Sequence, residues 1–395
     1  MEQQKQVQLI DVLNEQIEQG VNFDTGKVLK VPNERFVDPD IAEKEWENLF
    51  QNTPQVVGLS ADLPESGSAF TVAHLGAPIL CTRDRDGGFH AFLNVCRHRG
   101  HILVEEKRIR KGLISCPFHA WSYDLTGRLV SIPKEEQFGV IDKSCHGLIE
   151  LAAEELHGLL IVMPNPDLDF NAEEFLGPLA AELAPWKLGE AKYVSDVIWE
   201  TDCNWKSAVD TFGETYHFSV LHKETVAKSF FGNHAQYERY GNHHLMFFAN
   251  FELKDVVQET KDNWRIVRAG IPVYHFHPNI QLAFIRGAVV LIRIYPLCDD
   301  PSRSLSSVTY YYHNDRLADV GQEVDQADAT IELARLFGEV IQGEDYPAAE
   351  RSFRGMAANP TGYSILGRNE GNVQHFHEVW AQAMNMPALE EISGN

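Results

Sequence analysis

Apolar residues near the N-terminus recur with the spacing of a helix. Leu9, Ile10, Leu13 and Ile17 fall on one face between residues 6 and 19, and Gly20 follows them. Spacings of three and four residues predict an amphipathic α-helix, and a glycine often marks its end. The pattern therefore predicts a helix over residues 6–19.

From about Val56 to Val162 the pattern changes to short β-type runs. Segments such as AFTVAHL, APILCTRD, GFHAFLNVC and GLLIVMP are separated by Gly-Gly, Asp-Gly or Thr-Gly signals. Runs of this length between such turns are typical of antiparallel strands. They predict a small all-β domain, and the segment from Pro164 to Asp167 is its predicted exit linker.

A second β-rich region follows, and a long amphipathic helix comes after it. The predicted strands cover residues 190–202, 246–257, 263–275, 280–296 and 304–312. The helix carries an apolar stripe made of Leu317, Val320, Val324, Ala327, Ile331, Ala334 and Ile341. These patterns predict an α+β protein in three parts: an N-terminal helical segment (1–45), a β domain (46–165) and a larger C-terminal domain (166–395).

Composition and charge narrow the class of protein. The chain has 395 residues and a formal net charge of −23, which argues against binding to nucleic acid or to anionic membranes. The sequence contains no apolar run long enough to span a membrane, and its N-terminus lacks the features of a signal peptide. We therefore expect a cytoplasmic protein in which four scattered cysteines are reduced, buried thiols: Cys81, Cys145, Cys203 and Cys298.

Two Cys-His pairs form the densest candidate site. Cys96 and His98 lie in CRHRGH, and Cys116 and His119 lie in CPFHAW, which gives the spacing C-x-H-x17-C-x2-H. Two thiolates and two imidazoles are the ligands of a Rieske [2Fe-2S] centre. Zinc also accepts two Cys and two His, but zinc fingers usually have the spacings C-x2-4-C and H-x3-5-H. So dense a pattern disfavours the remaining interpretation, four unrelated residues.

A second group of candidate ligands lies further along the chain. Glu214 and His217 are three residues apart and share one face of a predicted helix. His222 follows five residues after His217, about 140° round an ideal helix. We therefore expect the helix to loosen between the histidines if both bind one metal. Taken alone, the pair fits an ordinary helix with two exposed histidines equally well.

The residues around these motifs resemble those of a known family. CRHRGH and CPFHAWSYDLTGRL are similar to the cluster loops of Rieske-type non-haem iron oxygenases, and NWK…D.F.E.YH….H is similar to their mononuclear-iron segment. The resemblance is to the terminal oxygenase alpha subunit of the ring-hydroxylating oxygenases. It implies a small all-β Rieske domain and a helix-grip (START-like) catalytic domain, in which an antiparallel sheet carries a long C-terminal helix. The implied cofactors are a [2Fe-2S] cluster and a mononuclear Fe(II), held respectively by Cys96, His98, Cys116 and His119 and by His217 and His222.

The resemblance also implies a third iron ligand and a bridging carboxylate. The family pattern ED….E..Q matches EDYPAAERSF here, except that Phe353 replaces Gln. We predict Asp345 as the third ligand because it continues the apolar stripe of the long helix, with Glu344 as the alternative. Family members are usually trimers, in which a carboxylate links an iron-binding histidine to a cluster histidine of the next subunit. We assign this catalytic bridge to Glu214, where the family more often has Asp, and to Asp210 if Glu214 is only a helix residue.

Other residues could compete with this site or modify it. Ala120 stands beside the cluster where the family usually has Gly. His275 and His277 share one face of a predicted strand, as do His375 and His377 if that segment is extended. Because neither pair has a carboxylate in a shared motif, we interpret them as core or pocket-lining residues.

The implied reaction is the oxygenation of a small organic substrate. Electrons from NAD(P)H would reach the cluster through a separate reductase or ferredoxin, since the chain contains no dinucleotide-binding fingerprint. O2 would then be activated at the iron, and an aromatic compound or a methylated amine would be hydroxylated or oxidatively demethylated. The alternative is a non-catalytic electron carrier or ligand-binding protein. The segments HHLMFFANF and VYHFHPNIQLAFIRG are candidates for an apolar substrate pocket.

Basic residues gather around the predicted cluster, although the chain as a whole is acidic. They are Arg97, Arg99, Lys107, Arg108, Arg110 and Lys111. Solvated hairpin charges are the alternative explanation, but an acidic electron donor needs a basic surface on an otherwise repulsive protein. We therefore expect the reductase or ferredoxin to dock here.

Overall fold

The computed structural model describes residues 1–297, 300–313 and 326–392. Contacts within the chain divide it into two units. The first consists of Met1–Trp46, Leu176–Trp186 and Ala191–Asn395, and the second of Glu47–Phe175 and Lys187–Glu190. The predicted three-part division at residues 45 and 165 stays a prediction.

The second unit is built from three antiparallel sheets, with the strand orders β10-β5-β4-β3-β6, β11-β12-β2 and β7-β8-β9. The strands are β2 (Gln55–Leu59), β3 (Ser68–Val72), β4 (Ile79–Arg83), β5 (Phe89–Leu93), β6 (Arg108–Arg110), β7 (Ile114–Ser115), β8 (Ser122–Tyr123), β9 (Leu129–Ser131), β10 (Glu150–Leu151), β11 (Ala153–Leu156) and β12 (Leu159–Val162). The short helix α4 (Ala172–Leu176) follows. This confirms the small all-β domain predicted from the alternating runs.

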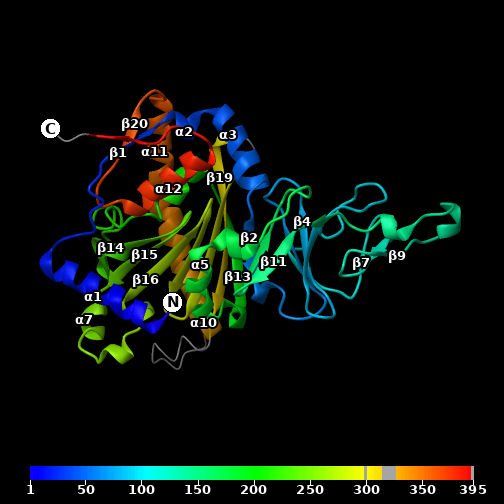
Figure 1. Cartoon of the computed structure of the whole chain (residues 1–395), viewed down its shortest axis with the longest axis horizontal. Helices are drawn as coiled ribbons and strands as arrows, with labels where there is room; N and C mark the ends of the chain where they lie inside the picture. The colour runs from blue at the N-terminus through cyan, green and yellow to red at the C-terminus, as the bar shows by residue number, and fades with distance from the viewer. Residues whose placement is uncertain (298–299, 314–325, 393–395) are drawn as a thin grey trace. The chain divides into compact units, whose positions relative to one another are not determined.

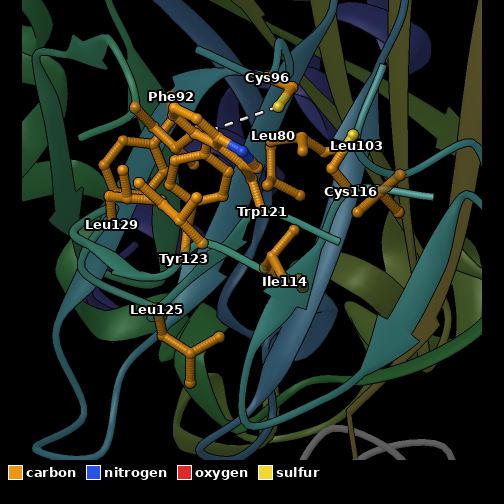
Figure 2. Packing of buried hydrophobic residues seen from close by; sticks show 14 residues of the cluster. Leu80, Phe92, Cys96, Leu103, Ile114, Cys116, Trp121, Tyr123, Leu125 and Leu129 are labelled. Atoms are coloured by element: carbon orange, nitrogen blue, oxygen red, sulfur yellow. Dashed lines mark hydrogen bonds between the residues drawn. The ribbon is translucent and has the colours of Figure 1, made fainter. Parts of the chain in front are cut away.

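One hydrophobic cluster holds both cysteine loops of this unit. Cys96, Cys116, Trp121 and Tyr123 are all buried in it, and Figure 2 shows them packed together with Phe92 and neighbouring leucines. The Tyr123 hydroxyl lies 3.4 Å from Cys96 Sγ, the contact drawn as a dashed line in Figure 2. Burial of apolar surface drives this packing, so the core that stabilises the unit also fixes the two cysteines.

The first unit is built on a seven-stranded antiparallel sheet with the order β13-β19-β18-β17-β16-β15-β14. Its strands are β13 (Lys192–Thr201), β14 (Phe230–Tyr240), β15 (His243–Asn250), β16 (Gly270–Phe276), β17 (Ile280–Ile285), β18 (Ala288–Leu297) and β19 (Asp300–Tyr312). A small sheet with the order β20-β1-β21 pairs Leu29–Pro32 (β1) with Tyr363–Leu366 (β20) and Glu390–Glu391 (β21).

Helices cover this sheet and its edge. They are α1 (Gln3–Gln19), α2 (Glu34–Val37), α3 (Pro39–Glu45), α5 (Pro178–Leu183), α6 (Trp205–Asp210), α7 (Leu253–Val256), α8 (Ile266–Ala269), α10 (Gln326–Val340), α11 (Tyr346–Ala358) and α12 (Gly371–Ala383). The π-helical turn η10 (Ile341–Asp345) joins α10 to α11. Figure 1 shows α1 beside α7, and α1 also contacts β14 and α8. The antiparallel sheet with a long C-terminal helix confirms the predicted helix-grip class.

Several elements match their predictions. The predicted helix 6–19 is α1, which ends at Gly20 in the left-handed conformation (φ +66°). Predicted strand 190–202 is β13, and 304–312 lies within β19. Of the predicted stripe on the long helix, Leu317, Val320 and Val324 lie outside the described residues. Ile331 is exposed, because the face of α10 turned to the sheet carries other apolar residues.

Other predictions of local structure were wrong. Strand 246–257 ends at Asn250, because Leu253 and Val256 are buried with helical spacing in α7. The first part of strand 263–275 is likewise helical (α8). Strand β14 was missed because its residues are almost all half-buried, which leaves no alternating pattern in the sequence. No described helix combines the length and the apolar composition needed to cross a membrane.

The four cysteines outside the metal motif do not share one environment. Cys81 and Cys203 are buried free thiols, as predicted. The prediction for Cys145 was wrong: it is exposed, because it lies in a short surface turn in which Asp142 accepts a hydrogen bond from Ser144 N–H. Cys298 lies outside the described residues.

Candidate active site and metal centres

The two cysteine loops of the second unit have the same backbone geometry. In each, the cysteine N–H donates to the carbonyl five residues later, and its own carbonyl accepts from the N–H four residues later, at 2.8–3.0 Å. Each loop turns at a left-handed residue, Gly100 (φ +73°) after Cys96 and Ala120 (φ +58°) after Cys116. The loops therefore present Cys96 and Cys116 in the same way, and each carries a histidine two or three residues further on.

The side chains of these loops fit a bound cluster. The rings of His98 and His119 lie 4.7 Å apart, and His98 stacks on Trp121 at 4.9 Å. His98 Nδ1 is buried and has no hydrogen-bond partner, although a buried polar atom normally has one. A ligand bond through this nitrogen would satisfy it.

Electrostatics supports the same conclusion. Burial, with smaller contributions from His119 and Arg99, lowers the pKa of His98, so its imidazole is neutral and can donate a lone pair. Burial also raises the pKa of Cys116, with Cys96 adding to the effect. A buried thiolate is therefore costly on its own, and a metal that binds it removes that cost.

The second group of ligands lies in irregular backbone after α6. The helix ends at Asp210, and residues 211–229 form successive turns. The helix predicted through Glu214 and His217 was therefore wrong, because the Glu214 carboxylate competes for the backbone and accepts from the N–H groups of Tyr216 and His217. This local turn, rather than a loosened helix, places the side chains of His217 and His222 on the same side of the backbone segment.

Three ligand atoms converge at this point. His217 Nε2 and His222 Nε2 lie 3.2 Å apart, and Asp345 Oδ1 lies 3.1 Å from His222 Nε2 and 3.5 Å from His217 Nε2. Within the described residues these three side chains form the group that could hold a metal ion. Adjacent ligands bound at right angles, with bonds of about 2.1 Å, are roughly 3 Å apart, and two His with one carboxylate form the facial triad of non-haem Fe(II) oxygenases.

Carboxylates outside the triad orient both imidazoles. His217 Nδ1–H donates to Glu214 Oε1, and His222 Nδ1–H donates to Glu344 Oε2 at 2.6 Å. With Nδ1 protonated, each neutral ring has its lone pair on Nε2, the atom that faces the triad centre. Such partners fix the tautomer and orientation of metal-binding histidines.

Without a cation at the centre, the three groups shift each other's pKa. Burial lowers the pKa of His217, but its hydrogen bonds to Asp345 and Glu214 outweigh this and raise it to about 9. Burial raises the pKa of Asp345, but hydrogen bonds from His217 and His222 outweigh this and lower it. Asp345 Oδ2 is buried without a partner. A divalent cation would replace the positive charge and satisfy this oxygen, so the residues fit a metal.

Asp210 is not part of this convergence. Its two carboxylate oxygens each lie 3.1 Å from His377 Nε2. His375 Nδ1 contacts His244 Nδ1 at 3.1 Å, and His275 is buried beside them. All four histidines that we interpreted as core or pocket-lining residues are buried, and none lines the cavity at the triad.

A cavity of about 560 Å³ opens beside the triad, within the first unit. Its volume is within the range of sites for small organic molecules. Apart from the ligands and their partners, its lining is mostly aliphatic side chains and phenylalanines. The cavity is lined by alternate residues of the two segments that we considered for a substrate pocket, HHLMFFANF and VYHFHPNIQLAFIRG.

Comparison with known proteins identifies the family. The model of the family described as ring hydroxylating alpha subunit (catalytic domain) matches residues 186–386. The chain belongs to this family. The Rieske [2Fe-2S] domain family matches residues 53–150. The chain is therefore a Rieske-type oxygenase with a [2Fe-2S] cluster and a mononuclear iron, which confirms the family, enzyme class and cofactors inferred from the sequence.

Similar proteins include oxygenases of several substrates. The carnitine monooxygenase oxygenase subunit of Escherichia coli (strain K12) is 26% identical over 368 residues, which cover 89% of this chain and 93% of that protein. The glycine betaine monooxygenase oxygenase subunit of Chromohalobacter salexigens is 31% identical over 198 residues, covering 50% of this chain and 44% of that protein. These relatives of the ring-hydroxylating alpha subunit family do not support the alternative of a non-catalytic carrier.

Solved structures show the same fold. The quaternary ammonium Rieske monooxygenase CntA in complex with L-carnitine has a TM-score of 0.75 at 22% identity, covering 90% of this chain and 96% of that chain. Naphthalene 1,2-dioxygenase with indole bound has a TM-score of 0.72 at 18% identity, covering 92% and 93%.

Two contacts, one at the triad and one outside it, were not predicted from the sequence. Glu344 was considered only as an alternative ligand, and its bond to His222 Nδ1 depends on the π-helical turn η10. The pairing of Asp210 with His377 joins residues far apart in the chain. An acidic side chain next to the predicted ligand Asp345 was the one available indication for Glu344.

Proposed function

We propose that this chain is the terminal oxygenase component of an electron-transfer system, and that it hydroxylates or oxidatively demethylates a small organic substrate. The observation that carries the proposal is the triad His217, His222 and Asp345 beside an apolar cavity. The net reaction for a monooxygenation is R–H + O2 + 2 e⁻ + 2 H⁺ → R–OH + H2O. The two electrons come from NAD(P)H through a separate reductase or ferredoxin.

The residues of each centre have separate roles in this proposal. Cys96, His98, Cys116 and His119 hold the cluster, and His217, His222 and Asp345 hold the iron. When bound, the cluster supplies single electrons and the mononuclear iron activates O2. Glu214 and Glu344 keep the Nδ1 protons of the two histidines in place, and the apolar lining excludes water from the reacting substrate. Asp345 rather than Glu344 is the third ligand, since Glu344 is already bound to His222 Nδ1.

We propose a homotrimer in which Glu214 bridges His217 and His119 of the partner subunit. Large apolar side chains are exposed beside both sites: Phe118 precedes His119, and Tyr216 precedes His217. Exposed apolar residues next to functional groups favour association with another surface. The carboxylate of Glu214 can accept a further N–H, because each oxygen has two lone pairs.

We propose that the electron donor docks beside the cluster. Of the six basic residues, Arg108 and Arg110 are already paired with Asp62 and Glu65. Arg97, Arg99 and Lys111 are exposed and best support the docking proposal. An acidic donor would be steered to them by charge.

Two further assignments stay proposals. The domain limits are those predicted from the sequence, 1–45, 46–165 and 166–395. A cytoplasmic location is supported by the described cysteines outside the cluster motif, since Cys81, Cys145 and Cys203 form no disulfide.

A screen of O2 consumption tests the oxygenase proposal. The purified chain, a surrogate reductase and NADH are mixed with candidate aromatic compounds and methylated amines. We expect at least one compound to accelerate O2 uptake and to give a product that contains oxygen from ¹⁸O2. An Asp345→Ala variant is the control, because reductase leakage continues in it while product formation stops. If no aromatic compound and no methylated amine accelerated O2 uptake or gave a product, the proposal would be contradicted.

A further inference from the structure

We propose that the cavity takes an uncharged, apolar substrate and discriminates against compounds that carry a carboxylate. The inference rests on the proposed function, because it assumes that the cavity beside the triad is the substrate site. It narrows that function, which leaves aromatic compounds and methylated amines equally open.

The floor of the cavity is an apolar surface that spans three strands. Met246, Val273 and Ala283 lie directly opposite one another across β15, β16 and β17. Phe248 pairs with Ile271 one step further along. Successive residues of a strand point to opposite faces, so these five side chains share the face that lines the cavity.

The polar part of the same sheet face does not reach the cavity. His244, His275 and Gln281 form the next cross-strand row, and all three are buried and absent from the cavity lining. His375 of α12 contacts His244 and covers this row. A polar group of a substrate therefore finds no hydrogen-bond partner on the floor.

The opposite wall comes from the long helix. Leu333, Leu336, Phe337 and Val340 of α10 line the cavity, and Ile341 of the π-helical turn follows them. Val226, Ile285 and Ile292 add to the aliphatic lining. The substrate thus lies between two apolar layers and meets polar atoms mainly at the triad end.

Apart from the triad histidines His217 and His222, the ionisable side chains in the described lining are acidic: Glu214, Glu339, Glu344 and Asp345. No lysine or arginine occurs among the described residues of this lining. Away from the iron, a carboxylate group of a substrate would lose its hydration, would gain no counter-ion from a lysine or arginine of the described lining, and would face like charges. The described lining therefore disfavours substrates that carry a carboxylate.

The acidic residues do not form a site for a cation either. Glu214 and Glu344 are bonded to the triad histidines, Asp345 faces both Nε2 atoms, and Glu339 is paired with Arg335. Each carboxylate already has a positive or hydrogen-donating partner, which weakens its attraction for a substrate cation.

The aromatic residues are packed against one another rather than around an open centre. The lining contains phenylalanine but no tryptophan or tyrosine among the described residues, and tryptophan gives the strongest cation–π contacts. The rings of Phe218 and Phe248 meet edge to face at 5.5 Å, and Phe230 meets Phe248 at 5.6 Å. Rings in mutual contact offer edges and apolar surface, which suits an uncharged substrate.

Two pairs of compounds separate the effects of the two charges, and within each pair a tert-butyl group is replaced by an isosteric trimethylammonium group. They are tert-butylbenzene (uncharged), phenyltrimethylammonium (cation), 4-tert-butylbenzoate (anion) and 4-(trimethylammonio)benzoate (zwitterion). Binding to the holoenzyme is measured by anaerobic equilibrium dialysis, and O2 uptake is measured in parallel with the surrogate reductase. We expect tert-butylbenzene to bind at least about tenfold more tightly than each of the others, since they must bury an unpaired charge.

Binding of the zwitterion or the anion within threefold of the uncharged compound would overturn the inference. Equal or tighter binding of phenyltrimethylammonium would also overturn it, in favour of a cation site, as would no binding of any of the four. If tert-butylbenzene alone binds but no compound on the wider screen is oxygenated, the proposed function fails while the cavity's preference stands. The two failures are thus distinguishable.

A pair of variants tests whether charge in the lining controls the preference. Leu336 lines the cavity and is partly exposed, so Leu336→Arg adds a cation to the wall with little disturbance of the core. We expect it to tighten binding of 4-tert-butylbenzoate by about tenfold and to weaken binding of tert-butylbenzene. Ile331→Arg is the matched control, because Ile331 is equally exposed on the same helix but does not line the cavity. The same gain in both variants would contradict the inference.

Discussion

His222 Nδ1 lies 2.6 Å from Glu344 Oε2, while His222 Nε2 lies 3.1 Å from Asp345 Oδ1. Two consecutive carboxylates therefore contact the two nitrogens of one imidazole. Consecutive side chains of an α-helix diverge by about 100°, and here the backbone at both residues belongs to a π-helical turn. Such turns occur frequently at functional sites. This geometry favours Asp345 as the third iron ligand and Glu344 as the residue that orients the imidazole of His222.

The first prediction concerns that separation. Asp345→Ala removes an iron ligand, so the iron content should fall from about three to about two per chain while the cluster spectrum is unchanged. Activity should be lost with the mononuclear iron. Iron analysis and the absorption spectrum of the purified variant measure both.

Glu344→Gln is the matched variant, since it changes the neighbouring carboxylate and keeps its size. Loss of such an orienting partner typically weakens metal affinity or activity by roughly 10–100-fold. We expect this variant to retain iron at saturating Fe(II) and to lose it more readily to a chelator. Full iron retention in Asp345→Ala together with iron loss in Glu344→Gln would reverse the two assignments.

The second prediction concerns the cluster potential. The Tyr123 hydroxyl donates to Cys96 Sγ and accepts from Arg97 N–H. Hydrogen bonds to the sulfur ligands raise the potential of a cluster, because they stabilise its reduced and more negative state. Tyr123→Phe should therefore lower the midpoint potential, by on the order of tens of millivolts for a hydrogen bond of about 1 kcal/mol. Redox titration followed by EPR checks this, and an unchanged or higher potential would show that the hydroxyl does not act on the cluster.

The third prediction concerns Ala120, which has the left-handed φ of +58°. A Cβ in this conformation costs roughly 1–2 kcal/mol, and glycine avoids that cost while losing part of the gain to its greater freedom when unfolded. Ala120→Gly should stabilise the second unit by about 0.5–1 kcal/mol, as measured by denaturant unfolding followed at the cluster absorbance. Ala73→Gly, at an exposed position without positive φ, should give no stabilisation. A destabilised Ala120→Gly variant would mean that the methyl group contributes to the loop.

The structure brings the residues of each predicted metal centre together, and there is a physical reason why the sequence pointed to them. Cys96 and His98, and likewise His217 and His222, are close in the chain, so short motifs contain most of their geometry. Asp345 was predicted because it continues an apolar stripe, where a carboxylate needs a partner. Contacts such as Asp210 with His377 depend on how distant elements pack, and no periodic pattern precedes them. Strand β14 was not predicted for a related reason: its residues are partly buried on both faces, so the sequence shows no alternation of apolar and polar residues.

The fourth prediction concerns stability in acid. Burial is the main cause that lowers the pKa of His277 to about 3, with neighbouring His243 and His375 adding to it. In the unfolded chain this histidine has a pKa of about 6.5, so the unfolded state binds the proton first. The stability contribution is complete above about pH 6.5 and is lost as the pH falls toward about 3.

His277→Gln removes this titration, so the free energy of unfolding should fall less steeply in the variant than in the wild type between about pH 6.5 and 4. The difference in slope should approach 1.4 kcal/mol per pH unit, roughly the value for one proton. Denaturant unfolding at several pH values measures both slopes. Metal loss at low pH affects both proteins equally, so it does not change the comparison of their slopes. Identical slopes would show that His277 does not titrate as the structure implies.

We propose that electrons pass from the cluster of one subunit through Glu214 to the iron at His217 of its neighbour, and a single-turnover measurement tests this route. The cluster is reduced chemically in the wild type and in Glu214→Gln, and both are mixed with O2 and the compound that gives the fastest uptake. We predict that both proteins contain both metal centres, that the wild-type cluster is oxidised as product forms, and that both rates fall by orders of magnitude in Glu214→Gln. If cluster oxidation were as fast in Glu214→Gln as in the wild type, and product formation likewise, electrons would not pass through Glu214.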